Sequence, residues 1–369
     1  MKLKLPLLLP FKKEKKEKPK KAGKQAPRRR TRPAPEIPES LEESSYTIMS
    51  GIVKINTKPQ IIFVGSSKGG AGKSFITAGL SIVTAALSRH KVYAIDFDID
   101  TRTLSNILPP LRFYDILEKE LRKRGTDYLN VGDILIMGTV RRGLLIPRIR
   151  SSTHACDGRV VDYDISFIPA FDKLKERWQA KQLNLINDSD VLSAVDELIK
   201  WMKLKKAKGA VFFIDSKPKG IQGINVEPIY SRLADRADLF LYIVEPSTMN
   251  LNMITDTYGS LLDKMVIVLN RLTPGVMDRA ITFIHDALEI KIPVFIIPEV
   301  PAEGEMVRKE YTVPVARDLV RYKTSRYILS LAYFLNLLDD DLVATYTCNR
   351  VIKQILGKLA EIYANLINH

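Results

Sequence analysis

The sequence predicts an α/β protein with a doubly wound, mostly parallel sheet. Three observations lead to this prediction: short apolar runs recur along the chain, helical patterns lie between most of them, and a glycine-rich segment joins the first run to the first helix. Alternation of strands and helical crossovers is typical of a parallel sheet covered by helices on both faces. The chain has 369 residues, of which 46% are hydrophobic, so a substantial core can form.

The first predicted strand lies at residues 60–66, and an amphipathic helix is expected to follow at 73–88. Further strands are expected where short apolar runs recur, namely at 92–97, 165–169, 210–215, 239–244, 265–270 and 294–298. Because parallel strands end at a common edge of the sheet, residues that follow these runs are candidates for one shared binding site.

Two regions interrupt the alternation. Residues 111–160 give mixed signals that include the basic stretch Arg141–Arg150, and we expect an insertion with one or two helices and a loop. After residue 321 the pattern predicts only helices, at 323–338 and 342–367. The last helix is expected to bury one apolar stripe, formed by Val351, Ile355, Leu359, Ile362 and Leu366. Its polar face is not strongly basic, so core or dimer packing is favoured over lipid binding.

The positive charge is concentrated at the N-terminus. Residues 1–32 carry fourteen Lys or Arg and two Glu, a net charge of +12, whereas the remaining chain is nearly neutral at +3. Charge and proline content predict disorder over 1–45, followed by a domain at 46–321 and a helical extension at 322–369. No segment resembles a secretory signal or a transmembrane helix. The tail could bind DNA, bind an anionic membrane, or serve as a linker.

The two cysteines, Cys156 and Cys348, form no CxxC pair. We therefore expect neither a disulfide framework nor a thiolate metal site, and the composition fits a protein of the reducing cytoplasm.

The glycine-rich segment after the first strand matches the phosphate-binding pattern G-x-x-x-x-G-K-[ST], from Gly65 to Ser74. Its glycines let backbone N–H groups approach phosphate oxygens, and the following helix directs its positive dipole end at them. Lys73 would then contact the β- and γ-phosphates, and the Ser74 hydroxyl would bind Mg²⁺. The segment predicts a nucleoside-triphosphate site.

A second lysine, Lys68, lies inside this loop, and the segment Lys-Gly-Gly-Ala-Gly-Lys-Ser resembles the deviant Walker A motif of the ParA/MinD family of P-loop ATPases. The resemblance implies that ATP joins two subunits into a homodimer and that Lys68 reaches the partner's nucleotide. It also implies a set of loop residues that bind the nucleotide: Gly69, Gly70, Ala71, Gly72, Lys73, Ser74 and Phe75.

Carboxylates follow two of the predicted strands at positions that resemble the same family. The resemblance implies that Asp96 orients a water on Mg²⁺ and that Asp98 positions the attacking water. It further implies that Asp215 holds Mg²⁺ as the Walker B acid. The family usually has proline two residues after this acid, whereas Lys217 stands there in this chain, which leaves the rate of hydrolysis open.

The resemblance extends over about residues 60–320 and includes the base site. Asn270 ends a predicted strand where the family has an adenine-contacting asparagine, and Pro298 begins the loop that lines the base. A guanine site would require Asn-Lys-x-Asp, and this chain lacks the acid. These features favour ATP.

By resemblance, the chain is expected to be a cytoplasmic ATPase whose dimer binds a surface and positions DNA or other cargo. Nucleoid DNA and the inner face of the membrane are both candidate surfaces, and an activating partner protein is implied. An ATP-binding scaffold with little turnover is the alternative, and steady-state phosphate release separates the two.

Overall fold

The structure is a computed structural model that describes residues 46–49, 52–66, 68–99, 101–140, 143–172, 176–183, 185–216, 227–310, 312–347 and 350–367. All of them belong to one unit, Glu43–His369. The predictions for residues 1–45 and for Lys217 concern residues outside these ranges.

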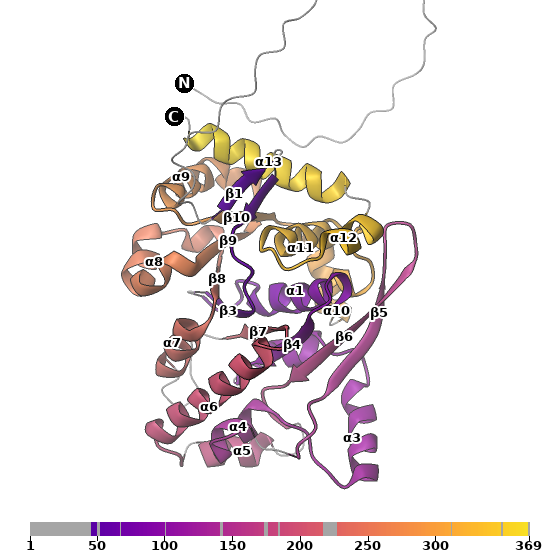
Figure 1. The fold of residues 1–369 in the computed structure, drawn as a ribbon. Helices are drawn as coiled ribbons and strands as arrows, with labels where there is room; N and C mark the ends of the chain where they lie inside the picture. The colour runs from indigo at the N-terminus through magenta and orange to yellow at the C-terminus, as the bar shows by residue number, and fades with distance from the viewer. Residues whose placement is uncertain are drawn as a thin grey trace, which may run out of the picture. The chain divides into compact units, whose positions relative to one another are not determined.

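Eight strands of the described residues form one sheet in the order β10-β9-β8-β3-β7-β4-β6-β5 (Figure 1). Their bounds are β3 Ile61–Gly65, β4 Lys91–Asp96, β5 Arg148–His154, β6 Val160–Ile168, β7 Ala210–Asp215, β8 Leu239–Val244, β9 Met265–Leu272 and β10 Val294–Pro298. Every neighbouring pair is parallel except β5 with β6. The prediction of a doubly wound, mostly parallel sheet is confirmed.

The helices lie in two layers, one on each face of the sheet (Figure 1). On one face α1 packs on β4, β6 and β7, with α11 outside it; on the other, α6 and α7 pack on β7 and β3. The α-helices are α1 Lys73–Leu87, α2 Thr103–Ile107, α3 Phe113–Arg124, α4 Val131–Met137, α5 Glu176–Leu183, α6 Asp188–Lys206, α7 Glu227–Arg236, α8 Leu251–Tyr258, α9 Met277–Glu289, α10 Pro301–Glu310, α11 Lys323–Phe334, α12 Asp340–Tyr346 and α13 Arg350–Ile367.

Two short strands, β1 Tyr46–Met49 and β2 Ile52–Ile55, form an antiparallel hairpin separate from the main sheet. The sequence pattern did not predict them, because four-residue strands give little periodicity. The hairpin packs on the last helix: the ring of Tyr46 meets that of Tyr363 edge-on, with centroids 5.1 Å apart. The chain therefore enters the described unit beside its C-terminal helix.

The insertion contains two helices, α3 and α4, within the expected one or two, and a strand that was not predicted forms at the end of its basic stretch. Arg148 and Arg150 lie in the edge strand β5, where both pair with Asp164 on β6. Opposite charges on neighbouring strands stabilise the pairing of these strands. These two basic side chains are thus partly neutralised within the sheet.

The expectation of one long final helix is wrong, because the structure has two helices there, α12 and α13. Packing of α13 against the core is confirmed, but the predicted stripe is also wrong. Among the predicted residues only Leu359 is buried; Val351, Ile355, Ile362 and Leu366 are half-buried. The buried face is formed by Ile352, Leu356, Leu359, Ala360 and Tyr363.

The hydroxyl of Tyr363 explains why α13 buries this face and not the predicted one. It accepts a hydrogen bond from the Val294 backbone N–H at 2.6 Å and donates one to the Val294 carbonyl at 2.8 Å. Edge strand β10 therefore selects the face of α13 that carries the tyrosine, because a buried phenol needs partners for its hydroxyl.

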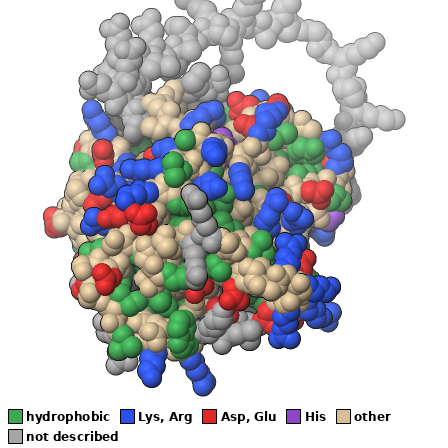
Figure 2. Space-filling view, turned by 60° about the horizontal axis from the view of Figure 1, so that its bottom comes forward, with side chains coloured by type: hydrophobic (Ala, Val, Ile, Leu, Met, Phe, Trp, Pro, Cys, Tyr) green, Lys and Arg blue, Asp and Glu red, His purple; other side chains and the backbone are tan. Residues whose placement is uncertain are grey.

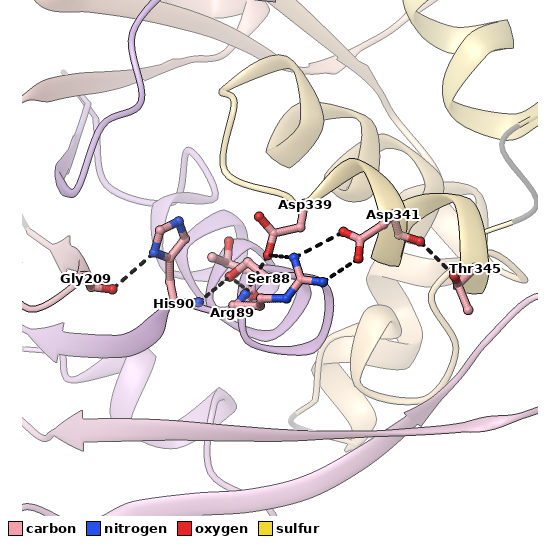
Figure 3. A network of polar contacts seen from close by, with 8 residues as sticks. Ser88, Arg89, His90, Gly209, Asp339, Asp341 and Thr345 are labelled. Atoms are coloured by element: carbon pink, nitrogen blue, oxygen red, sulfur yellow. Dashed lines mark hydrogen bonds and ion pairs between the residues drawn. The ribbon is translucent and has the colours of Figure 1, made fainter.

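A polar network joins the end of α1 to α12 (Figure 3). The Arg89 backbone N–H donates to Asp339 at 2.8 Å, and its guanidinium pairs with both Asp339 and Asp341. The Asp339 N–H donates to the Leu87 carbonyl at 3.0 Å. The helix that begins at the phosphate loop is thus fixed at its other end to the C-terminal extension.

Contrary to expectation, Cys156 is disulfide-bonded; the other cysteine in the sequence, Cys348, lies outside the described residues. The Cys156 backbone N–H donates to the Tyr346 carbonyl at 3.1 Å, so the connection between β5 and β6 lies against the end of α12. The wide spacing of Cys156 and Cys348 in the sequence was therefore no ground for excluding a disulfide.

On the face seen in Figure 2, Lys and Arg side chains alternate with Asp and Glu and with hydrophobic patches. This mixture fits the near-neutral charge of the chain after residue 32. Among the described helices, none combines the length and apolarity needed to cross a membrane.

Candidate functional site

The predicted phosphate loop connects β3 to α1, as expected. Gly70 and Gly72 have φ values of 85° and 95°, in the left-handed region that favours glycine. A Cβ on Gly72 would lie 2.4 Å from Nδ2 of Asn270, and that Nδ2 donates to the Ala71 carbonyl at 2.8 Å. The loop therefore depends on glycine both for its conformation and for the close approach of Asn270.

The two lysines of the loop have opposite environments. Lys73 is buried, with 6% exposure, and its Nζ donates to Oγ of Ser66 at 2.9 Å. That hydroxyl donates to the Lys68 carbonyl at 2.7 Å, which stabilises the loop from inside. The Lys68 side chain is 54% exposed, and its Nζ lies 3.6 Å from Glu245. The Lys73 side chain is therefore buried inside the site, whereas the Lys68 side chain lies at the solvent-exposed edge of the site, which we call the rim.

Three predicted carboxylates meet beside the loop. Asp96 on β4 and Asp215 on β7 are register partners on adjacent strands, and neither is exposed. Asp98, two residues after β4, is 4% exposed. The carboxyl ends of these parallel strands lie at the same edge of the sheet as the phosphate loop, which brings the predicted residues together.

The carboxylates differ in their hydrogen bonds. Asp96 accepts bonds from the Ser105 N–H at 2.7 Å and the Ser105 hydroxyl at 2.6 Å, and a third from the Asp98 N–H at 3.1 Å. Asp98 accepts the Thr101 N–H at 3.0 Å and also the Thr101 hydroxyl. Asp96 and Asp98 are therefore fixed by the segment that follows β4.

Asp215 is the unsatisfied member of this cluster. Its Oδ1 accepts the Thr77 hydroxyl at 3.3 Å and its side chain hydrogen-bonds with Ser74, but its buried Oδ2 has no hydrogen-bond partner. Burial raises the pKa of Asp215, and burial together with the nearby charge of Asp215 raises that of Asp96. A dry site with excess negative charge is unfavourable unless a cation neutralises it.

This donor set fits Mg²⁺. The Ser74 hydroxyl and a carboxylate with a free oxygen are hard oxygen ligands beside a phosphate loop, as this metal requires. Lys73 is the neighbouring basic group that lowers the pKa of Asp215. Ser74 and Asp215 would hold the metal, and the bound metal would supply charge neutralisation for phosphoryl transfer.

The predicted base-site residues lie at the same edge of the sheet. Asn270 is buried near the end of β9, and Pro298 ends β10, where it pairs in register with Leu272. Phe75, in the first turn of α1, is half-buried against the core. Asn270 contacts the loop backbone directly, so it also has a structural role that the sequence did not reveal.

Several contacts of the site were missed by the sequence analysis. Ser66 is part of the motif but was treated as a spacer, although its hydroxyl bridges the two lysines. Ser105 and Thr101 follow the acidic segment and carried no recognisable spacing. Glu245 directly follows β8 and Arg271 is the second-to-last residue of β9, so both lie near the ends of apolar strands, as Asp215 does, and that shared position was the available signal.

Comparison with protein families identifies a nucleotide-binding domain. The model of the CobQ/CobB/MinD/ParA nucleotide binding domain matches residues 62–313, which include the phosphate loop, the three carboxylates and Asn270. A comparison with curated proteins found no match.

Solved structures with similar folds include a MinC:MinD cell division protein complex from Aquifex aeolicus, with 19% identity, 74% of this chain and 94% of that chain covered, and a TM-score of 0.46. A ParA family ATPase from Chlorobium tepidum has 15% identity, 75% and 100% coverage and a TM-score of 0.45. A putative plasmid partition protein from Borrelia burgdorferi bound to AMPPNP has 16% identity, 75% and 98% coverage and a TM-score of 0.47. The assignment rests on the family match, which spans more than half of the sequence: the chain belongs to the ParA/MinD family of P-loop ATPases.

Proposed function

We propose that this chain is an Mg²⁺-dependent ATPase in which ATP joins two copies into a dimer and hydrolysis separates them. The observation that carries the proposal is the contrast between the lysines of one loop. Lys73 is buried toward the carboxylates, whereas the Lys68 side chain is 54% exposed at the rim. A lysine on the rim can reach a nucleotide bound to a second copy, as the deviant Walker A motif implies.

Each group of the site has a role in this proposal. The loop N–H groups and Lys73 would bind the phosphates, and Ser74 and Asp215 would hold the metal. Asp96, whose carboxylate accepts two hydrogen bonds from Ser105, would orient a water beside the metal. Asp98 positions the attacking water, and Lys68 of the partner subunit stabilises the charge that develops on the phosphates.

The dimer is proposed to bind a polyanionic surface and to position DNA or another cargo, with an activating partner protein that speeds hydrolysis. Nucleoid DNA and the inner face of the membrane are the candidate surfaces. The charge distribution supports a polyanion, because residues 1–32 carry a net charge of +12.

One observation favours the alternative of an ATP-binding scaffold with little turnover. Both carboxylate oxygens of Asp98 accept hydrogen bonds from Thr101, which leaves Asp98 fewer lone pairs with which to position a water. Thr101→Ala removes the hydroxyl contact to Asp98 and keeps the backbone hydrogen bond. If the chain is a cycling ATPase held at rest by this contact, basal phosphate release rises in the variant; a scaffold shows no turnover in either form.

Three measurements test the proposal. Light scattering with ATP should show a dimer for the wild type and a monomer for Lys73→Ala. Phosphate release should be stimulated by DNA or by anionic liposomes. Deletion of residues 2–32 should remove salt-sensitive binding, which for ~6–10 neutralised phosphates falls about 10³- to 10⁵-fold between 50 and 200 mM salt. A Lys73→Ala variant that still dimerises with ATP would contradict the switch.

A further inference from the structure

The rim lysine has a partner that the family resemblance does not supply. Glu245 directly follows β8, the strand beside β3, so its carboxylate lies at the same sheet edge as the phosphate loop. Its Oε2 lies 3.6 Å from Nζ of Lys68, and its Oε1 accepts Nη1 of Arg271 at 3.0 Å. One carboxylate thus binds two cations, one through each oxygen.

The Glu245 side chain is held more firmly than its partners. It is 14% exposed, whereas the side chains of Lys68 and Arg271 are both 54% exposed. Its backbone is fixed by Thr248: the Glu245 N–H donates to the Thr248 hydroxyl at 3.3 Å, and that hydroxyl donates to the Glu245 carbonyl at 3.1 Å. The Glu245 carboxylate is therefore less exposed than the two cations that it contacts, and Thr248 holds its backbone.

Arg271 strengthens this arrangement. It has a φ of 57°, in the left-handed region that a side chain other than glycine seldom adopts, and it follows Asn270, which contacts the phosphate loop. Near the C-terminal end of β9, its guanidinium contacts Glu245. A residue kept in such a conformation is a candidate for a functional role.

From these contacts we infer that Glu245 is a latch that holds Lys68 on its own subunit until nucleotide arrives. The inference rests on the proposed dimer switch and describes the nucleotide-free state of that switch. A carboxylate beside the loop repels the phosphates of ATP and competes with them for Lys68 and Arg271. Phosphate binding weakens the hold on Lys68, which then becomes available to the second subunit. Glu245 is a positioning residue in this scheme, since it acts through Lys68.

The latch itself can be tested without a dimer. An amine-reactive acetylating reagent modifies accessible lysine amines, so loss of the contact with Glu245 should raise the labelling rate of Lys68, measured by peptide mass spectrometry on the nucleotide-free full chain. We expect about a two- to fivefold rise for Glu245→Gln, the range of a partly exposed ion pair, with Glu245→Asp restoring much of the protection. Glu197→Gln is the matched control, because Glu197 pairs with Lys200 on α6, and it should leave Lys68 labelling unchanged.

The consequence for the switch is tested by light scattering. Glu245→Gln should lower the ATP concentration for half-maximal dimerisation about two- to fivefold, and the change should vanish when Lys68→Ala is also present. Faster labelling without ATP-dependent dimerisation in any variant would support the latch and contradict the proposed dimer. Normal dimerisation with unchanged labelling and unchanged ATP dependence in Glu245→Gln would overturn the latch alone.

Discussion

The inner and outer parts of the nucleotide site are built in different ways. The inner part consists of Lys73, Asp96 and Asp215, all buried and positioned by adjacent strands or by the first turn of α1. The outer part consists of Lys68, Glu245 and Arg271, which meet at the rim and form ion pairs with solvent access. In the proposed cycle, a bound cation and phosphates complete the inner part, and the outer part exchanges one ionic partner for another.

The environment explains this division of roles. Charges in a buried site interact strongly and are hardly screened, so the inner part can stabilise the transferring phosphoryl group. Pairs near the surface are weak and sensitive to salt, which suits groups that must change partners during a cycle. The following predictions test the comparison, beginning with the largest expected effect.

Removal of the buried lysine should abolish the catalytic function of the inner part. Lys73→Ala is expected to lower kcat/KM for ATP by about 10³-fold, because one preorganised charge at the reacting phosphates is lost. Steady-state phosphate release measures this effect, and near-normal hydrolysis in the variant would show that Lys73 does not contact the phosphates.

Removal of the rim lysine should separate binding from turnover. Lys68→Ala is expected to bind a fluorescent ATP analogue within about threefold of wild type, since an exposed group contributes little to the site of its own subunit. Hydrolysis should fall by about 10²-fold, because the partner's charge is missing. If nucleotide affinity and hydrolysis fell equally, Lys68 would be acting in its own subunit.

The buried carboxylate of Asp215 should make the free energy of unfolding depend on pH. Burial raises the pKa of Asp215 from 3.8 to about 7, so the folded chain binds this proton more tightly than the unfolded chain does. The resulting cost to stability is absent below the ordinary carboxyl pKa, grows as the pH rises through the raised value, and is fully present above it.

Without Mg²⁺, Asp215→Asn should therefore exceed the wild type in free energy of unfolding by about 2 kcal/mol at pH 8, and the difference should disappear near pH 4. Urea denaturation across this pH range measures it. A difference independent of pH would assign the effect to packing instead.

The smallest effect is expected where the inner part meets the base site. Asn270→Ala removes the hydrogen bond to the Ala71 carbonyl and should weaken ATP binding about five- to tenfold, with a loss of about 1 kcal/mol in stability. Calorimetric titration with ATP and with GTP checks this. Unchanged affinity for both nucleotides would show that Asn270 does not contact the base.

Local patterns were sufficient to predict much of this molecule. The strands at 210–215, 239–244 and 294–298 and the helix after the phosphate loop were predicted from apolar runs and glycine spacing, because a buried parallel strand has to be apolar throughout. The inner residues were predictable for a related reason: Asp96 and Asp215 each end such a strand, and parallel strands bring their ends together.

What could not be predicted depends on contacts distant in sequence. The apolar residues of α13 cover more than one face, and the Tyr363 contact with Val294 decides which of them is buried. The pairing of Lys68 with Glu245 joins two loop residues that are far apart in the sequence, with no fixed spacing. The same holds for Cys156, whose surroundings come from α12.

The central claim is that Lys68 acts on the nucleotide of a second copy, and mixing two inactive variants tests it most directly. Lys68→Ala and Asp98→Asn should each be nearly inactive alone. A mixed dimer contains one complete site, with the Lys68→Ala subunit supplying Asp98 and the Asp98→Asn subunit supplying Lys68. The account predicts that phosphate release in an equal mixture recovers to about a quarter of the wild-type rate. No recovery in a mixture shown to form mixed dimers would contradict it.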